Sequence, residues 1–584
     1  MPSPLPHPPL LTPNPLRPAP ACPAPLRTPS PCCAFPFIQR PLPMPPPPHP
    51  PSFSAADDPW IEVRTGHRYH RVGLRELLLD AHTFDDLAVP HPPAAAGLLR
   101  IAVALTARVT ALDDPDLNAS RWNQLRRDHF AAGRFDADRI NAYFDSDQNC
   151  WDVFDPLRPW MQDPALREEC ESTAGINALV PGRPSGNNLA WFAPHASHTQ
   201  APVATGRALQ HLLIHHFYGR FGTCTPRTPS SGKASKNLRG GPLRTSVSFH
   251  PMGRTLHETL LAGLPLFRGD EQLLPDRCPW EEPQPPDPLA APHPVTWPGR
   301  LLTGRSVHAL LLLPGDDSTT VRDTYFTWAT RHPSPEATDP YLAYHLDFSK
   351  EVAHRRTVRR ADADRAWWRE LDTLALAPDE EGPTRRPAIF DTLNDLPPPL
   401  RRTLRVRVIG FEQNTTKAID HQWYTALTPP LLHWAHEHDP ARAQRIADCC
   451  RAAELAAEQL AIHTNDAWRT ATAPRGTNPS QTKKKPSTGK TKKPSTGKAR
   501  KNCVWARQAL HRYWPLAEQL FWQMLEEPDT SPHTAFAQAA VTALRQSTTH
   551  ARARDRAAAR ALAEAVAGII RRTADPAPPH TRSI

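Results

Sequence analysis

The chain has 584 residues, and its 69 Lys and Arg residues against 59 Asp and Glu residues give a formal net charge of +10. This length predicts two to four domains. Nine of the cations lie between Lys483 and Lys501, where no acidic residue occurs, and the rest of the chain carries a net charge of about +1. The high isoelectric point therefore reports one basic tract. It excludes a protein that is basic over its whole surface.

Several other classes are excluded by composition. No run of about 18 apolar residues occurs, so no membrane-spanning helix is expected. The amino-terminal segment has no continuous apolar stretch of the kind found in secretory signals. The ten cysteines are scattered and form no C-x-x-C pair. This pattern supports neither a zinc ribbon nor a disulfide framework, and we expect a cytoplasmic protein.

Proline marks the first segment, because 21 of the first 50 residues are Pro. Residues 1–52 are therefore expected to be a disordered, extended stretch. Residues 58–72 read as a β-hairpin with a turn at Thr65-Gly66, and a helix is expected from Leu74 to Asp80. The near-continuous apolar run 94–111 predicts a buried core helix.

The middle of the chain mixes helix, strand and loop signals. Helices are expected at 139–144 and 201–217, and polar loops at 181–195 and 222–242. Residues 301–314 and 321–328 have the composition of β-strands. Residues 403–409 alternate apolar and basic side chains, as in a half-buried strand.

After Thr428-Pro429-Pro430 the pattern becomes helical only. Apolar stripes recur at helical spacing within 446–460, 505–520 and 558–569. Together with a helix near 430–437 they predict a four-helix bundle. Residues 474–502 contain a repeated PSTGK and many lysines, and we expect a disordered basic insertion there. The predicted fold class is α+β: a mixed α/β domain over 53–427, then the bundle over 428–574.

No enzyme signature is present. The paired aspartates lie in turn-like contexts, and His215 and His216 are helical neighbours that point in different directions. There is no phosphate-binding G-x-x-x-x-G-K-[ST] and no G-x-S-x-G elbow. We therefore expect no catalytic residue, no metal and no cofactor. The polar loops do combine Gly, Asn and cations, which can approach phosphates and base edges closely.

Read in order, six segments resemble the CasA family, the large subunits of type I-E CRISPR Cascade complexes. They are FSAADDPWIEV, VGLRELLLDAH, WDVFDPLRPWMQ, RPSGNNLAWF, KNLRGGP and the long block GFEQNTTKAIDHQWYTALTPP. The resemblance covers about residues 53–572, apart from the lysine-rich insertion.

The resemblance implies a non-catalytic subunit that works with the other Cascade subunits and the guide RNA. Such a subunit recognises a protospacer-adjacent motif in double-stranded DNA, promotes local unwinding and R-loop formation, and recruits a helicase-nuclease. This fits the physics of RNA-guided recognition, in which base pairing reads the long sequence and the protein reads a short motif.

The resemblance also implies site residues. A glycine-rich loop, a lysine-finger position and a glutamine wedge place the DNA-binding residues at Lys233, Lys236, Arg239, Gly240, Gly241, Arg331, Gln413 and Asn414. The loop near the guide RNA or the rest of the complex is placed at Ser185, Gly186, Asn187 and Asn188. Arg331 is the basic residue available between Tyr325 and Thr338. The alternative interpretation is a nucleic-acid-binding scaffold that uses the lysine tract and does not recognise a motif.

Overall fold

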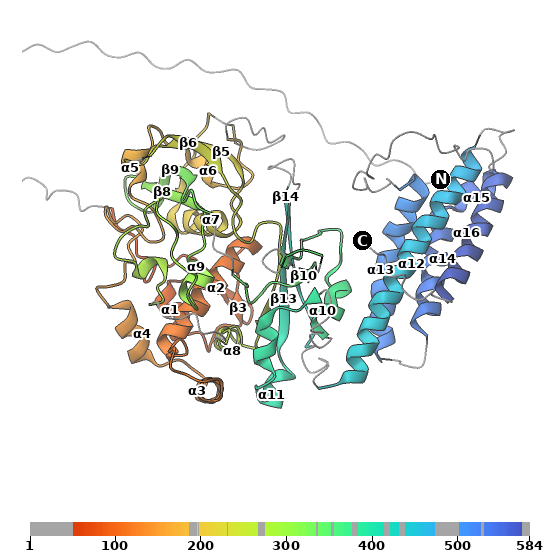
Figure 1. The fold of residues 1–584 in the computed structure, drawn as a ribbon, viewed down its shortest axis with the longest axis horizontal. Coiled ribbons are helices and arrows are strands. Elements are labelled where there is room, and N and C mark those ends of the chain that lie inside the picture. Colours follow the sequence, from red (N-terminus) through yellow and green to blue (C-terminus); the bar gives the residue numbers. More distant parts are fainter. Residues whose placement is uncertain are drawn as a thin grey trace, which may run out of the picture. The chain divides into compact units, whose positions relative to one another are not determined.

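The computed structural model describes residues 51–574 apart from 186–194, 197, 231, 267–274, 334–336, 348, 352–355, 376–383, 414–420, 431–437, 474–501 and 527–530. Within that range the chain is a mixed α/β body with several small sheets, followed by a helical region (Figure 1). The predicted order, mixed α/β first and helical last, is confirmed. The expected extension 1–52 lies almost wholly outside the described residues.

The body begins with the predicted hairpin and helix. Strands β1 (Ile61–Thr65) and β2 (Arg68–Val72) pair antiparallel, and β3 (Asp86–Leu87) pairs with the other edge of β1. Gly66 occupies the turn with φ of +59°, a conformation that glycine adopts without strain. Helix α1 (Leu74–Leu79) follows directly.

Helix α2 (Pro92–Thr110) is the predicted core helix. It is long and apolar enough to cross a membrane, and 94% of its most apolar window is buried inside the body. The two prolines at its start suit the first turn, where the N–H groups have no helical partner. Burial against neighbouring helices accounts for its apolar composition.

Three further sheets complete the body, with antiparallel orders β4-β9-β8, β14-β13-β7 and β11-β10-β12, besides the two-stranded pair β5-β6. Their strands are β4 (Val203–Ala204), β5 (Gly222–Arg227), β6 (Ser235–Leu238), β7 (Val247–Met252), β8 (His308–Pro314), β9 (Thr320–Trp328), β10 (Tyr344–Leu346), β11 (Arg356–Val358), β12 (Thr384–Arg385), β13 (Arg405–Gln413) and β14 (His421–Leu427). The β-strands predicted within 301–314 and 321–328 are confirmed as β8 and β9, although 299–303 is helical.

The remaining helices of the body are α3 (Ala119–Ala132), α4 (Ala137–Phe144), α5 (Leu166–Glu169), α6 (Ile176–Leu179), α7 (Thr205–Tyr218), α8 (Leu256–Ala262), α9 (Gly299–Thr303), α10 (Leu371–Ala375) and α11 (Pro398–Arg401). Short 3-10 helices cover Pro279–Glu281, Trp367–Glu370 and Ala388–Leu393. The helices expected at 139–144 and 201–217 correspond to α4 and α7.

The predicted loop 222–242 is wrong for its first part, which forms the β5-β6 hairpin. Polar composition concealed the strands because few of their side chains face the core. Cys224, Arg227 and Leu238 are buried. Burial of Arg227 is offset by two acidic partners, since its guanidinium pairs with Asp163 at 2.8 Å and with Glu169 at 2.5 Å. A strand stabilised by a buried ion pair shows no simple alternation of apolar residues.

The carboxy-terminal region consists of α12 (Pro440–Thr472), α13 (Val504–Glu526), α14 (Pro532–Ser547), α15 (Thr549–Arg554) and α16 (Arg556–Ala574). No described residue from 440 to 574 is in a strand. The helix expected near 430–437 falls outside the described residues, and α14 was not predicted. The stripe on α12 is buried as expected. On α13, Ala509 and Tyr513 of the expected stripe are buried, Trp505, Leu516 and Leu520 are half-buried, and Ala506, Ala517 and Phe521 are buried in addition.

Three buried histidines near the carboxyl end of α7 should make stability depend on pH. His216 donates from Nε2 to the Met161 carbonyl at 2.8 Å, and His215 donates from Nε2 to the Leu179 carbonyl at 2.8 Å. Burial lowers the pKa of both to about 4 and that of His308 to about 3. Each is therefore neutral in the folded body.

In the unfolded chain these histidines titrate near pH ~6.5. Their contribution to the free energy of unfolding is therefore complete above that pH. For each histidine, this contribution falls by about 1.4 kcal/mol per pH unit as the pH drops toward 4. The free energy of unfolding, measured with denaturant at several pH values between pH 7 and pH 5, should fall less steeply with decreasing pH in His216→Gln than in the wild type. His67→Gln, at an exposed position of the β1-β2 turn, serves as the control. Equal slopes for all three proteins would contradict the prediction.

Candidate nucleic-acid interface

Four of the cations predicted to bind DNA lie on two neighbouring segments of the body. Lys233, Lys236 and Arg239 belong to the β5-β6 hairpin and its exit, and Arg331 follows β9. All four side chains are exposed. Hydrogen bonds from two of these arginines join the segments. Arg331 donates to the Lys233 carbonyl at 3.2 Å, and Arg239 donates to the Thr330 carbonyl at 3.0 Å and to the His332 carbonyl. We call these four residues the basic strip.

The end of β9 provides the platform for the strip. The Trp328 ring carries the Arg331 guanidinium at 4.2 Å from its centroid, and its indole N–H donates to the Ser235 carbonyl at 3.0 Å. A planar guanidinium stacks well on an indole face. The same tryptophan therefore fixes the hairpin and orients Arg331. At the position implied for the lysine finger, the structure therefore has an arginine, Arg331, that stacks on Trp328 beside the β5-β6 hairpin.

Gly240 and Gly241 form the turn that leads from the strip into β7. The Gly241 N–H donates to the Gly219 carbonyl at 2.9 Å, and a Cβ at Gly241 would lie 2.7 Å from the Phe217 carbonyl oxygen. This backbone contact with the end of α7 requires glycine. The buried Gly241 therefore has a packing role in the turn, and its N–H is already occupied within the fold.

The β13-β14 hairpin is longer than expected and includes Gln413. The strand was predicted to end at Ile409, but β13 continues to Gln413, which pairs with His421 of β14. Gly410 does not end the strand, because pairing with β14 continues through it, and its missing side chain leaves room for the Tyr424 ring of β14. Gln413 is 6% exposed and is not part of the connecting loop. That loop, with Asn414, lies outside the described residues.

Two further arginines, not predicted from the sequence, lie near one another at this end of the body: Arg244 contacts the hairpin, and Arg220 contacts β9. Arg244 donates from Nε to the Gln413 side-chain carbonyl and from a terminal nitrogen to the Tyr218 carbonyl. Arg220 stacks on Phe326 at 5.5 Å. Burial lowers the pKa of both arginines. The sequence could have indicated Arg244, since it is the second cation of the glycine-containing segment LRGGPLR.

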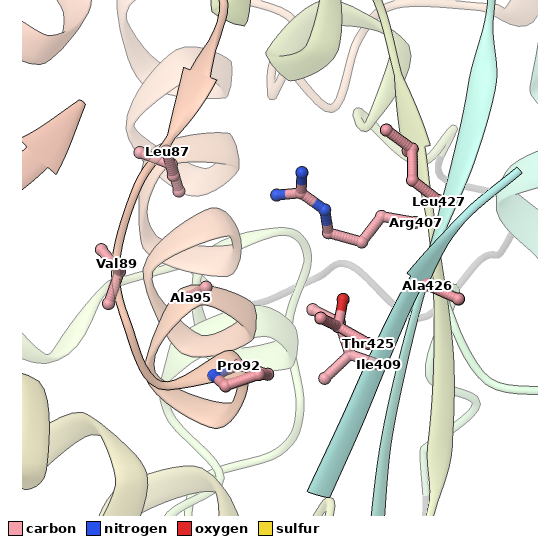
Figure 2. Close-up of a pocket in the computed structure, with 9 residues that line it drawn as sticks. All are labelled: Leu87, Val89, Pro92, Ala95, Arg407, Ile409, Thr425, Ala426 and Leu427. Carbon is pink, nitrogen blue, oxygen red and sulfur yellow. The ribbon is translucent and has the colours of Figure 1, made fainter. Parts of the chain in front are cut away.

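A pocket of about 280 Å³ lies between the start of α2 and the β13-β14 hairpin (Figure 2). Its lining is Leu87, Val89, Pro92, Ala95, Arg407, Ile409, Thr425, Ala426 and Leu427. The one charged group in this lining is the Arg407 guanidinium. It donates two hydrogen bonds to the Asp86 carboxylate, one of them to Oδ1 at 3.0 Å. The pocket therefore resembles an apolar crevice closed by a salt bridge more than a catalytic cleft.

The loop expected near the guide RNA is described only at its beginning. Ser185 is half-buried at the edge of the described residues, and Gly186, Asn187 and Asn188 lie outside them. Arg183, two residues before Ser185, anchors the start of this loop, because its guanidinium donates to the Ala201 carbonyl at 2.7 Å.

Comparisons with a family model, with a curated relative and with solved structures agree on one family. The model of the family CRISPR-associated protein Cse1 matches residues 55–560. The CRISPR-associated protein CasA/Cse1 of Thermus thermophilus is 28% identical over 333 residues, which are 55% of this chain and 60% of that relative. That alignment therefore spans less than two thirds of the relative.

Solved structures cover more of the chain. In a CRISPR RNA-guided surveillance complex, one chain is 32% identical, with a TM-score of 0.76 over 89% of this chain and all of its own length. Thermus thermophilus CasA (Cse1) has a TM-score of 0.66 at 20% identity, over 90% of this chain and 99% of its own. Thermobifida fusca Cse1 has a TM-score of 0.68 at 19% identity, over 90% and 98%. These last two show likeness of fold. Because the family model matches most of the sequence, this chain belongs to the Cse1 family of CRISPR-associated proteins.

Proposed function

We propose that this chain is the large subunit of a type I-E CRISPR RNA-guided surveillance complex. In this role it recognises a protospacer-adjacent motif in duplex DNA, promotes local unwinding and R-loop formation, and recruits a helicase-nuclease. Its partners are the other subunits of the complex, the guide RNA and the target duplex, in the cytoplasm. It carries no catalytic residue and needs no metal or cofactor. The chain with 32% identity in a surveillance complex supports this assignment.

The observation that carries the DNA-binding part is the gathering of three segments far apart in sequence. The β5-β6 hairpin, the residues after β9 and the β13-β14 hairpin are connected through Arg331, Arg239 and Arg244. Exposed cations supply affinity for phosphates without reading sequence. A nearby hairpin on a rigid sheet can supply the reading and the wedge. We place the wedge in the hairpin connection that begins at Asn414.

We also propose that the chain has two domains, 53–427 and 428–574, and that the second is a four-helix bundle. The helices α12, α13, α14 and α16 contact one another and bury aligned apolar faces, which supports a bundle with α14 as its fourth member. Residues 474–502 would be a basic insertion between α12 and α13.

The test compares three targets bound by the complex assembled with its guide RNA. They are a duplex with the motif, the same duplex with a scrambled motif, and the motif duplex already unpaired beside the motif. Motif recognition predicts tighter binding of the first duplex than of the second, and Asn414→Ala should impair the closed duplex more than the opened one. Unwinding by a wedge must offset a few kcal/mol of base unstacking, which the opened target does not require.

The scaffold alternative predicts a different result. Equal affinity for the motif and scrambled duplexes, with binding lost when residues 474–502 are deleted, would overturn motif recognition. Deletion of this tract from a motif reader should only reduce the salt dependence and leave the preference intact.

A further inference from the structure

Arg244 joins three parts of the body through its side chain and backbone. Its guanidinium donates to the Gln413 side-chain carbonyl on β13 and to the Tyr218 carbonyl at the end of α7. Its backbone N–H donates to the Gly241 carbonyl at 3.1 Å. The glycine turn, the end of α7 and the end of the β13-β14 hairpin therefore meet at one residue.

The surroundings of Arg244 suit an arginine and no other cation. The guanidinium lies 5.2 Å from the centroid of Phe411 and 5.9 Å from that of Phe221. Burial, with the neighbouring Arg220, lowers the pKa of Arg244 to about 9. A planar guanidinium can stack on rings while it donates in two directions, which a lysine ammonium cannot reproduce. The geometry thus fixes the plane of the side chain.

The contact also determines what Gln413 does. Gln413 is the last residue of β13, it is 6% exposed, and its side-chain oxygen accepts a hydrogen bond from Arg244. A buried amide held in this way is poorly placed to enter a DNA duplex. It is well placed to fix where the hairpin connection leaves the sheet.

We propose that Arg244 is a positioning residue. It holds the end of the β13-β14 hairpin at a fixed place against the glycine turn, through Gln413, so that the connection which follows can open the duplex beside the motif. This inference rests on the proposed function. The alternative is that Arg244 contacts a DNA phosphate directly. In that case the charge of the side chain would matter and its shape would not.

The experiment uses the complete complex with its guide RNA and the closed and opened motif duplexes. Arg244→Met and Arg244→Lys are both expected to weaken binding of the closed duplex about tenfold relative to the opened one, which is a part of the few kcal/mol that unstacking a base step costs. Gln413→Leu should have the same effect. The double variant Arg244→Met, Gln413→Leu should be no worse than either single variant. Gln413→Glu, which keeps an acceptor for the guanidinium, should remain close to wild type.

Arg254→Met is the matched control, since Arg254 is an exposed arginine paired with Glu258 on α8. It should leave the ratio of the two affinities unchanged. If Arg244→Met fails to assemble with the complex, Arg244→Lys and Gln413→Leu carry the test. Wild-type behaviour of Arg244→Lys together with a reduced salt dependence of Arg244→Met would overturn the proposal in favour of a phosphate contact. Additive losses in the double variant would overturn it as well. Failure of the wild-type complex to distinguish motif from scrambled duplex would instead refute the proposed function.

Discussion

Replacing Arg100 with leucine is expected to destabilise the body by about 3–5 kcal/mol, the usual consequence of removing one partner of a buried ion pair. Arg100 lies on α2, and its two terminal nitrogens each donate to one carboxylate oxygen of Asp339 at 2.8 Å. Both side chains are 1% exposed. Burial acts to raise the pKa of Asp339, but the Arg100 guanidinium holds that pKa below its usual value. Without Arg100 the carboxylate loses its main compensation.

Thermal unfolding of the purified chain at neutral pH measures this loss of stability. The midpoint of the first transition should be lower for Arg100→Leu than for the wild type. Arg254→Gln is the control, because an exposed i,i+4 pair contributes only about 0.3–0.5 kcal/mol. The double variant Arg100→Leu, Asp339→Leu should be less destabilised than Arg100→Leu alone, since it leaves neither charge of the pair buried. A single variant as stable as the control would contradict the structural account of this pair.

Neutralising the basic strip should have the largest effect on DNA affinity. With Lys233, Lys236, Arg239 and Arg331 all replaced by glutamine, up to four phosphate contacts are lost. Each contributes roughly 0.9 to the slope of the logarithm of affinity against the logarithm of salt concentration. Between 50 and 200 mM salt the wild-type complex should therefore lose about two orders of magnitude more affinity than the variant.

Titration of a motif-bearing duplex into the assembled complex at several salt concentrations gives this slope. Replacing four lysines of the 474–502 tract by glutamine is the matched control, and it should leave the discrimination between motif and scrambled duplexes intact. Similar slopes for the strip variant and the wild type would mean that the strip faces another partner. Arg239 and Arg331 also hold carbonyl groups within the body, so a melting curve should accompany each variant.

The sequence by itself determined the order of the parts and much of the local structure. The hairpin at 58–72, the core helix at 94–111 and the change to helices after residue 428 follow from periodicity, because burial of one face imposes a fixed spacing on apolar residues. The family, too, could be read from the order of short motifs. The cations of the basic strip could also be named from the sequence, since a glycine-containing polar loop shows its charges directly, and their role in DNA binding stays a prediction.

The tertiary structure decided how these segments meet. Gln413 was expected in a loop, yet it is the buried end of a strand, where it pairs with His421 and its side chain accepts a hydrogen bond from Arg244. Gly241 was expected among the DNA-binding residues, and only the structure shows that its N–H donates to the Gly219 carbonyl just after α7. The role of Arg244 depends on Gln413, 169 residues further along the chain. Periodicity reports which face of an element is buried, whereas such contacts depend on which distant side chain arrives there.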